Sequence, residues 1–202
     1  MSASNGTLVL TTGEPAGVGP ELAVQLLQQP VDDLLCIAAD PELLLQRAAL
    51  LKLPLALKSD TLIAPGGQAT LLAIDLAAPS QPGQLDTTNA PYVVQMLKRA
   101  TDGCLKGEFA GVVTGPVQKS TLIEAGNDFI GHTEFLAARA GVKTPVMMLA
   151  SEELRVALVT IHIPLTEVSP AVTPEHLEAV LRVVDADLQT RFGIATPTIG
   201  VC

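Results

Sequence analysis

A histidine and a threonine stand side by side in the segment Gly131-His132-Thr133-Glu134-Phe135. Apolar residues at helical spacing follow from Phe135, which predicts that a helix starts at His132 or Thr133. A phosphate bound at such a helix start would meet backbone N–H groups, a hydroxyl and an imidazole together. A His-Thr pair that only caps its helix is commoner than a substrate site, so the residues alone leave both interpretations open.

A second histidine, His162, ends an apolar run that predicts a strand over Arg155–His162. An imidazole there could ligate a metal or transfer a proton, because its reference pKa of about 6.5 is close to neutrality. One histidine does not make a metal site, which commonly takes three protein ligands. The alternative is a hydrogen-bonded loop histidine. His176 is expected in the first turn of a helix, where exposure or capping is the commoner role.

Two further segments could contact a ligand. Gly13, Gly17 and Gly19 join a predicted strand to a helix that begins near Pro20. Their spacing matches neither the dinucleotide fingerprint nor the P-loop, so a tight turn and a ligand loop are equally good interpretations. Lys119 follows another predicted strand and could hold a phosphate or carboxylate, although lysines are usually just solvated.

The elements that must position these residues follow from hydrophobic periodicity. Continuous apolar runs that alternate with helical patterns predict a largely parallel sheet covered on both faces, and hence the α/β class. The segment 64–84 is rich in Pro and Gly around one short strand, which indicates an irregular excursion or an antiparallel hairpin. The predicted strands are Thr7–Thr12, Leu34–Ala39, Leu53–Leu57, Thr70–Leu76, Phe109–Thr114, Val146–Ala150, Arg155–His162 and Thr198–Cys202.

Two helix starts carry strong local signals. Asp40-Pro41-Glu42 supplies an N-cap, a proline at the first helical position and an acidic first turn. Thr173-Pro174-Glu175 repeats the device before an apolar stripe that ends at Gly193. Helices are therefore expected after Asp40 and after Thr173.

Composition excludes several classes of protein. The 202 residues carry a net charge of −9, with 48% hydrophobic and 16% charged residues, which argues against disorder. The acidic balance argues against nucleic acid and against an acidic membrane surface as partners. No apolar run is long enough to span a membrane. With no secretory leader pattern at the start of the sequence, a cytoplasmic protein is expected.

The cysteines and the C-terminal segment bear on structure rather than on chemistry. Cys36, Cys104 and Cys202 lie far apart, so neither a zinc knuckle nor a disulfide framework is indicated. Cys36 and Cys202 are expected to be small core residues. Residues 197–202 are typical of a buried strand that feeds a loop and a helix, yet the sequence stops there. We therefore expect a truncated chain whose C-terminal part is missing.

Four motifs in this order resemble the 4-hydroxythreonine-4-phosphate dehydrogenase family of pyridoxal phosphate biosynthesis. The resemblance extends from about Thr7 to Cys202, and four motifs in register are far more specific than any one of them. The motifs are Gly13-Glu14-Pro15-Ala16-Gly17-Val18-Gly19-Pro20, Thr114-Gly115-Pro116-Val117-x-Lys119, Gly131-His132-Thr133-Glu134-Phe135 and Val159-Thr160-Ile161-His162-Ile163-Pro164-Leu165.

The resemblance implies an α/β/α sandwich of the isocitrate and isopropylmalate dehydrogenase type, with two domains and a cleft between them. Residues 1–128 would form the first domain, incomplete without the C-terminal part, and 129–202 the start of the second. A homodimer with its active site at the interface is also implied.

The implied reaction is the NAD-dependent or NADP-dependent oxidation and decarboxylation of a phosphorylated hydroxy amino acid. By this resemblance His132 and Thr133 bind substrate, and His162 is one of three histidine ligands of a divalent metal (zinc, magnesium or cobalt). The other two ligands and most cofactor-binding residues would lie beyond Cys202, so the chain as given is expected to be inactive. No family role is carried onto Lys119 or the Gly13–Gly19 loop. Two alternatives stay open: a dehydrogenase of a related four-carbon hydroxy acid phosphate, and a non-catalytic anion-binding fragment.

Overall fold

The computed structural model describes residues 6–31 and 34–202, and the chain forms two compact units, Met1–Ala140 and Gly141–Cys202. Residues 1–5, part of the segment in which a leader pattern was sought, lie outside the described residues. The domain boundary expected between residues 128 and 129 stays a prediction.

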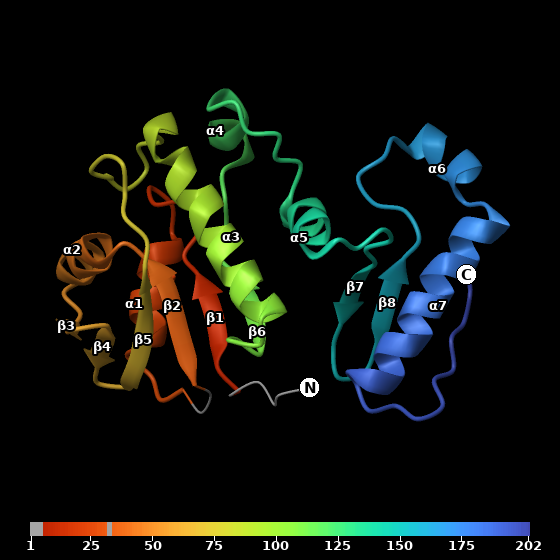
Figure 1. Cartoon of the computed structure of the whole chain (residues 1–202), viewed down its shortest axis with the longest axis horizontal. Coiled ribbons are helices and arrows are strands. Elements are labelled where there is room, and N and C mark those ends of the chain that lie inside the picture. The colour runs from red at the N-terminus through yellow and green to blue at the C-terminus, as the bar shows by residue number, and fades with distance from the viewer. Residues whose placement is uncertain (1–5, 32–33) are drawn as a thin grey trace. The chain divides into compact units, whose positions relative to one another are not determined.

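Unit 1 contains a six-stranded sheet and its helices (Figure 1). The strands are β1 (Leu8–Thr11), β2 (Leu35–Ala39), β3 (Ala56–Lys58), β4 (Thr61–Ala64), β5 (Gly67–Ala73) and β6 (Gly111–Thr114). The helices are α1 (Gly19–Leu26), α2 (Pro41–Leu51), the short 3-10 helix η1 (Thr87–Asn89), α3 (Ala90–Leu105), α4 (Lys119–Glu124) and α5 (His132–Ala140).

The sheet has the order β3-β4-β5-β2-β1-β6. Strands β5, β2, β1 and β6 run parallel, whereas β3, β4 and β5 pair antiparallel. The hairpin of β4 and β5 occupies the start of the Pro- and Gly-rich region, so the hairpin alternative is confirmed for residues 64–73. The predicted α/β class is confirmed, with a sheet that is parallel from β5 to its β6 edge and antiparallel at its β3 edge.

Both faces of the sheet are covered, as the continuous apolar strands predict. Cys36 and Ala38 of β2 point into a core with α3, whereas Leu35, Ile37 and Ala39 point into a core with α1 and α2. Figure 1 shows α3 crossing one face while α1 lies behind the sheet. Cys36 is 3% exposed, which confirms its expected place in the core. Alternating residues of one strand thus stabilise two separate hydrophobic layers.

The predicted caps start their helices. Asp40 Oδ1 accepts a hydrogen bond from Leu43 N at 2.9 Å, and α2 begins at Pro41. Thr173 Oγ1 accepts from His176 N at 3.2 Å, and the helix α7 (Pro174–Thr190) follows. In both places the side chain satisfies a donor that the first helical turn leaves free, so these two helix predictions are confirmed.

Unit 2 consists of the antiparallel pair β7 (Met147–Ala150) and β8 (Arg155–Leu158), the short helix α6 (Leu165–Ala171) and α7. Val180, Val184 and Leu188 of α7 form its buried core, against Met148 of β7 and Ala157 of β8. These three positions are four residues apart, so they lie on one face of the helix.

Two predictions in unit 2 are wrong. β8 ends at Leu158, four residues before His162, because its partner β7 is only four residues long. Residues 198–202 form no strand, since none of the described strands pairs with them, and Cys202 is exposed rather than part of the core. Pro197–Cys202 instead line one side of an apolar pocket over β8 and α7. Among the described helices, none has the length and apolar character needed to cross a membrane.

Candidate functional site

The carboxyl ends of β1 and β6 place two of the sequence motifs next to each other. The two strands are parallel neighbours, with Thr11 opposite Thr114, so the loops that follow them leave the same edge of the sheet. This edge is where open α/β sheets collect ligands. The first loop carries the Gly13–Gly19 segment, and the second leads into Lys119.

The two loops pack backbone against backbone. Glu14 N donates to Pro116 O at 2.9 Å, and Gly115 N donates to Thr11 O at 2.7 Å. Gly13 has a φ of +74°, and a Cβ at this position would collide with the carbonyl of Pro116. The glycine at position 13 is therefore required by the tight packing of the two loops. A ligand role of the Gly13–Gly19 loop stays untested.

Buried polar groups form hydrogen bonds beneath the loop that follows β1. Thr12 Oγ1 donates to Ala38 O at 3.2 Å and lies 3.0 Å from the hydroxyl of Tyr92. Asp40 N donates to the same Tyr92 oxygen at 3.4 Å. Burial raises the pKa of Tyr92 to about 12. The hydroxyl is therefore neutral at pH 7 and links β1, α3 and the start of α2.

Two charged side chains are enclosed near the same loop. Glu14 is 5% exposed, and burial raises the pKa of its carboxyl although Oε1 accepts a hydrogen bond from Ala16 N. Arg47 is fully buried; Nη2 donates to Pro15 O at 2.9 Å, whereas Nε and Nη1 have no partner among the described residues. Burial lowers the pKa of Arg47, while Glu21 opposes this effect.

Arg47 was not among the residues expected to matter from the sequence. It lies three and four residues after Leu44 and Leu43, on the buried face of α2, and this spacing is the signal that could have found it. Its role in the structure is to hold the Gly13–Gly19 loop by the carbonyl of Pro15.

The His132–Thr133 pair begins α5, as predicted. The rings of His132 and Phe129 pack edge to face, with ring centroids 5.9 Å apart and planes at 87°. His132 Nε2 is sealed from solvent and has no hydrogen-bond partner among the described residues. Burial, and then the positive charge of Lys119, lower the pKa of His132 below its usual value. The imidazole is therefore neutral at pH 7, while Thr133 beside it is partly exposed.

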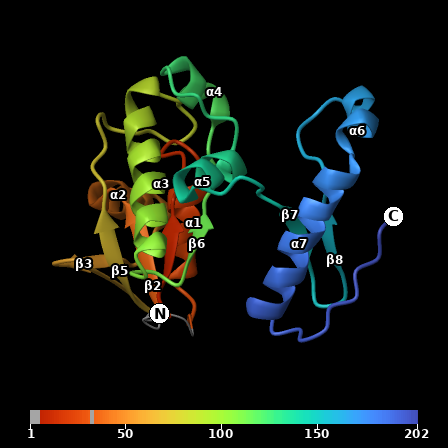
Figure 2. The ribbon, with the colours of Figure 1, turned by 45° about the vertical axis from the view of Figure 1, so that its right-hand side comes forward.

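Lys119 lies close to the start of α5. A Cβ built on Gly131 would lie 3.5 Å from Lys119 Nζ and 2.8 Å from Glu134 Oε2. Lys119 is exposed and forms no ion pair with the carboxylates that the structure describes. α4 and α5 both follow β6 (Figure 2). Leu122 of α4 and Phe129, between the two helices, join the same core as α3. The structure thus brings together three of the four motifs: the Gly13–Gly19 loop packs on the loop before Lys119, and Lys119 lies close to the segment that begins at Gly131.

His162 belongs to the other unit. It is exposed, lies in the loop between β8 and α6, and has a φ of +57°, which is unusual for a residue with a side chain. Its ring makes no hydrogen bond to described residues, so both nitrogens are free. No group of three potential ligands gathers anywhere in residues 6–31 and 34–202.

His176 lies in the first turn of a helix, as expected, but its ring is half-buried and is not itself a cap. Its backbone N–H is capped by Thr173, and its Nε2 lies 2.8 Å from Val159 O. This ring ties the start of α7 to the residue that follows β8, and it is engaged by the protein itself.

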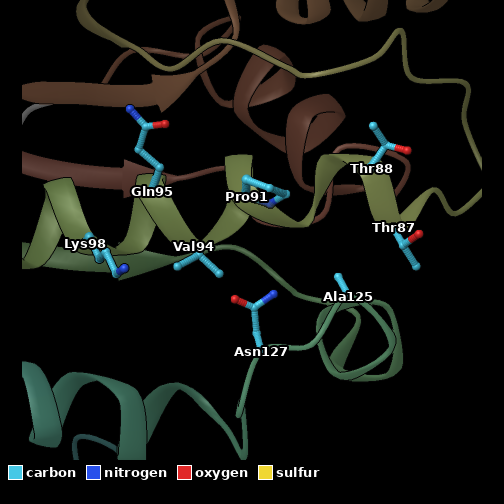
Figure 3. Close-up of a pocket in the computed structure, with 8 residues that line it drawn as sticks. All are labelled: Thr87, Thr88, Pro91, Val94, Gln95, Lys98, Ala125 and Asn127. Atoms are coloured by element: carbon cyan, nitrogen blue, oxygen red, sulfur yellow. The ribbon is translucent and has the colours of Figure 1, made fainter.

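A pocket of about 730 Å³, lined by both polar and apolar residues, lies elsewhere in unit 1, between the first half of α3 and the segment after α4 (Figure 3). Lys98 on α3 and Asn127 opposite it are among its polar residues, and Asn127 Nδ2 already donates to Leu122 O. None of the four sequence motifs contributes to this pocket, so it is separate from the predicted site.

Comparisons with known proteins identify a family for this chain. The family model described as "Pyridoxal phosphate biosynthetic protein PdxA" matches residues 31–202. The 4-hydroxythreonine-4-phosphate dehydrogenase of Yersinia enterocolitica is 50% identical over the whole chain. That of Citrobacter koseri is 52% identical over 96% of the chain. The chain spans 62% and 61% of the lengths of these two relatives.

Solved structures show the same fold. The 4-hydroxythreonine-4-phosphate dehydrogenase from Klebsiella pneumoniae matches 98% of the chain with a TM-score of 0.85 and 27% identity, and the chain covers 64% of it. The corresponding structure from Burkholderia phymatum matches 97% of the chain with a TM-score of 0.79 and 29% identity, with 62% of it covered. The chain belongs to the family of the pyridoxal phosphate biosynthetic protein PdxA.

Proposed function

We propose that the chain is the N-terminal part of an enzyme that oxidises and decarboxylates 4-phosphohydroxy-L-threonine in pyridoxal 5′-phosphate biosynthesis. The observation that carries this proposal is the 50% identity to 4-hydroxythreonine-4-phosphate dehydrogenase over the complete chain. The substrate is a phosphorylated hydroxy amino acid, and the reaction removes a hydride from its secondary alcohol before carbon dioxide leaves.

His132 and Thr133 bind the substrate in this proposal. The support is local: α5 begins at His132, its first backbone N–H groups lack intrahelical acceptors, and the Thr133 side chain is partly exposed beside them. A neutral imidazole and a hydroxyl can each donate a hydrogen bond to a phosphate or hydroxyl oxygen. The electrostatic field at a helix N-terminus favours the negative charge of such a ligand.

His162 holds a divalent metal, with zinc, magnesium and cobalt as the candidates. Its exposed ring with two unengaged nitrogens fits an imidazole ligand, and nitrogen donors suit zinc and cobalt better than magnesium. The described residues supply this single ligand, so the remaining ligands must come from other parts of the complete enzyme. Such a metal supplies Lewis-acid polarisation of a substrate oxygen.

The wider organisation is also proposed from the family. The cosubstrate is NAD or NADP, which accepts the hydride. The complete protein has the two-domain isocitrate dehydrogenase-like fold, with the first domain at 1–128 and the second beginning at 129, and an active site in the cleft between them. It is a cytoplasmic homodimer that assembles this site at its interface.

One experiment tests the metal role directly. In a full-length family member that contains this sequence, His162→Ala should abolish metal-dependent NADH formation and lower the bound metal measured by elemental analysis. His176→Ala is the matched control, since that ring is engaged by Val159 and should leave metal content unchanged. Full turnover and unchanged metal content in His162→Ala would contradict the assignment.

The same protein distinguishes the alternatives. NADH formation with 4-phosphohydroxy-L-threonine should exceed that with a four-carbon hydroxy acid phosphate that lacks the amino group. The reverse order would favour the related dehydrogenase. No turnover with either substrate, but retained phosphate binding, would favour a non-catalytic anion-binding protein.

A further inference from the structure

Lys119 has no assigned role, yet it is the charged residue that the structure brings to the start of α5. It opens α4, directly after the loop that packs on the Gly13–Gly19 segment. Its Nζ lies 3.5 Å from the position that a Cβ on Gly131 would take, one residue before His132. Gly131 is buried and directly precedes α5. The Lys119 ammonium therefore lies close to the backbone at the start of this helix.

Glu134 is the other charged residue that lies next to Gly131. Glu134 Oε2 approaches the same Gly131 position from within α5, but it makes no ion pair with Lys119. At the other end of α5, Arg139 is engaged with Asp102 of α3 at 2.6 Å. No described carboxylate therefore neutralises the positive charge of Lys119 by direct contact. The charge can disfavour a second positive charge nearby.

The two nitrogens of His132 are in different environments. Nε2 is sealed and has no partner, whereas Nδ1 is neither sealed nor hydrogen-bonded to a described residue. A buried N–H without an acceptor is rarer and costlier than a buried acceptor without a donor. The neutral ring should therefore carry its proton on Nδ1, the nitrogen that the protein leaves open to a ligand.

We infer that Lys119 is a positioning residue of the His132–Thr133 site: from its place over Gly131, its ammonium maintains His132 as an uncharged ring that offers its Nδ1–H to the ligand. The inference rests on the proposed function for the role of His132 in binding. Two positive charges close together repel, so a proton on Nε2 would be opposed both by burial and by Lys119. The lowered pKa of His132, with burial as the larger cause and Lys119 as the second, is consistent with this geometry.

The test is a histidine titration by NMR on the chain itself, without substrate, metal or turnover. The sequence has three histidines, so the signals can be assigned by single substitutions. The side-chain ¹⁵N shifts of His132 should report the Nδ1–H tautomer at neutral pH. Lys119→Met should raise the pKa of His132, but leave it below that of histidine in the urea-unfolded chain because burial remains.

Two variants serve as controls. Lys119→Arg keeps the positive charge and should restore the titration of His132. Lys58→Met removes an exposed lysine at the end of β3 and should leave it unchanged. The backbone amide spectra of all variants should match that of the unsubstituted chain away from the substituted residue, which shows that the fold is intact.

An unchanged titration of His132 in Lys119→Met would overturn the inference, and so would an Nε2–H tautomer in the unsubstituted chain. Neither result would depend on whether the complete enzyme turns over its substrate. Conversely, loss of the metal role of His162 would leave this titration unaffected, so the two proposals fail separately.

Discussion

Tyr92 allows the energetics of the sheet edge to be measured with a single probe. It is the one tyrosine in a sequence without tryptophan, so tyrosinate absorbance reports on this residue alone. The side chain is 1% exposed, and its hydroxyl lies 3.0 Å from Thr12 Oγ1. Burial raises its pKa from 10.0 to about 12.

The sign of the resulting pH dependence follows from linkage. Below pH 10 the hydroxyl is neutral in both the folded and the unfolded chain, so the full stabilisation is present. Above pH 10 the unfolded chain ionises first, which favours unfolding until the folded chain ionises near pH 12. At 1.36 kcal/mol for each unit, the free energy of unfolding should fall by about 2.7 kcal/mol across this window because of Tyr92.

Urea unfolding at a series of pH values, together with absorbance titration of the folded and unfolded chain, measures this effect. Other groups also ionise above pH 10: the lysines, and Cys36, whose pKa burial raises to about 11. Tyr92→Phe is the control, because it keeps their contributions to the pH dependence of stability. The Phe variant should lose about 1 kcal/mol at neutral pH from the missing hydrogen bond with Thr12. Above pH 10, its free energy of unfolding should fall less steeply with pH than that of the unsubstituted chain. Ionisation of Tyr92 near pH 10 in the folded chain, or parallel curves for the two proteins, would refute the reasoning.

Two further substitutions probe the same edge of the sheet. Gly13→Ala should destabilise the chain by more than the ~1–3 kcal/mol expected from its positive φ alone, because the added Cβ collides with a backbone carbonyl of the neighbouring loop. Gly126→Ala is the control, because Gly126 has a φ of +82° and open space around it, so this substitution costs only the backbone strain. Equal urea midpoints for Gly13→Ala and Gly126→Ala would contradict the packing argument. Asp40→Ala should cost about 2 kcal/mol, since one carboxylate oxygen caps Leu43 N and the other accepts from Leu76 N. Asp40→Asn keeps the cap of Leu43 and should lose less; an alanine variant as stable as the parent in urea would show that the cap contributes nothing.

Features specified by neighbouring residues were predicted well from the sequence. The helices after Asp40 and Thr173 begin where a capping side chain and a proline define the first turn. Within the apolar run Leu34–Ala39, residues Leu35–Ala39 form a strand buried on both faces, because each of them has a helix or strand to pack against, whereas Leu34 is exposed. These predictions depend on information that lies within a few residues of each element.

Features that depend on distant partners were predicted less well. A strand over residues 198–202 needs a neighbour to accept its hydrogen bonds, and apolar character alone does not supply one. The same argument explains why β8 stops before His162. Arg47 shows the converse: helical spacing places it on the buried face of α2, but nothing local reveals that loops near Pro15 and Ser80 enclose it.

The loops after β1 and β6 are packed so tightly that they should move together. With Gly13 and Gly115 bringing carbonyls and amides into direct contact, one loop cannot shift without displacing the other. Lys119 directly follows the second loop, and Val18, near the end of the first loop, is 56% exposed. A fluorophore attached at Val18 should therefore sense rearrangements of Lys119, and would offer an optical readout of ligand arrival that avoids labelling the site itself.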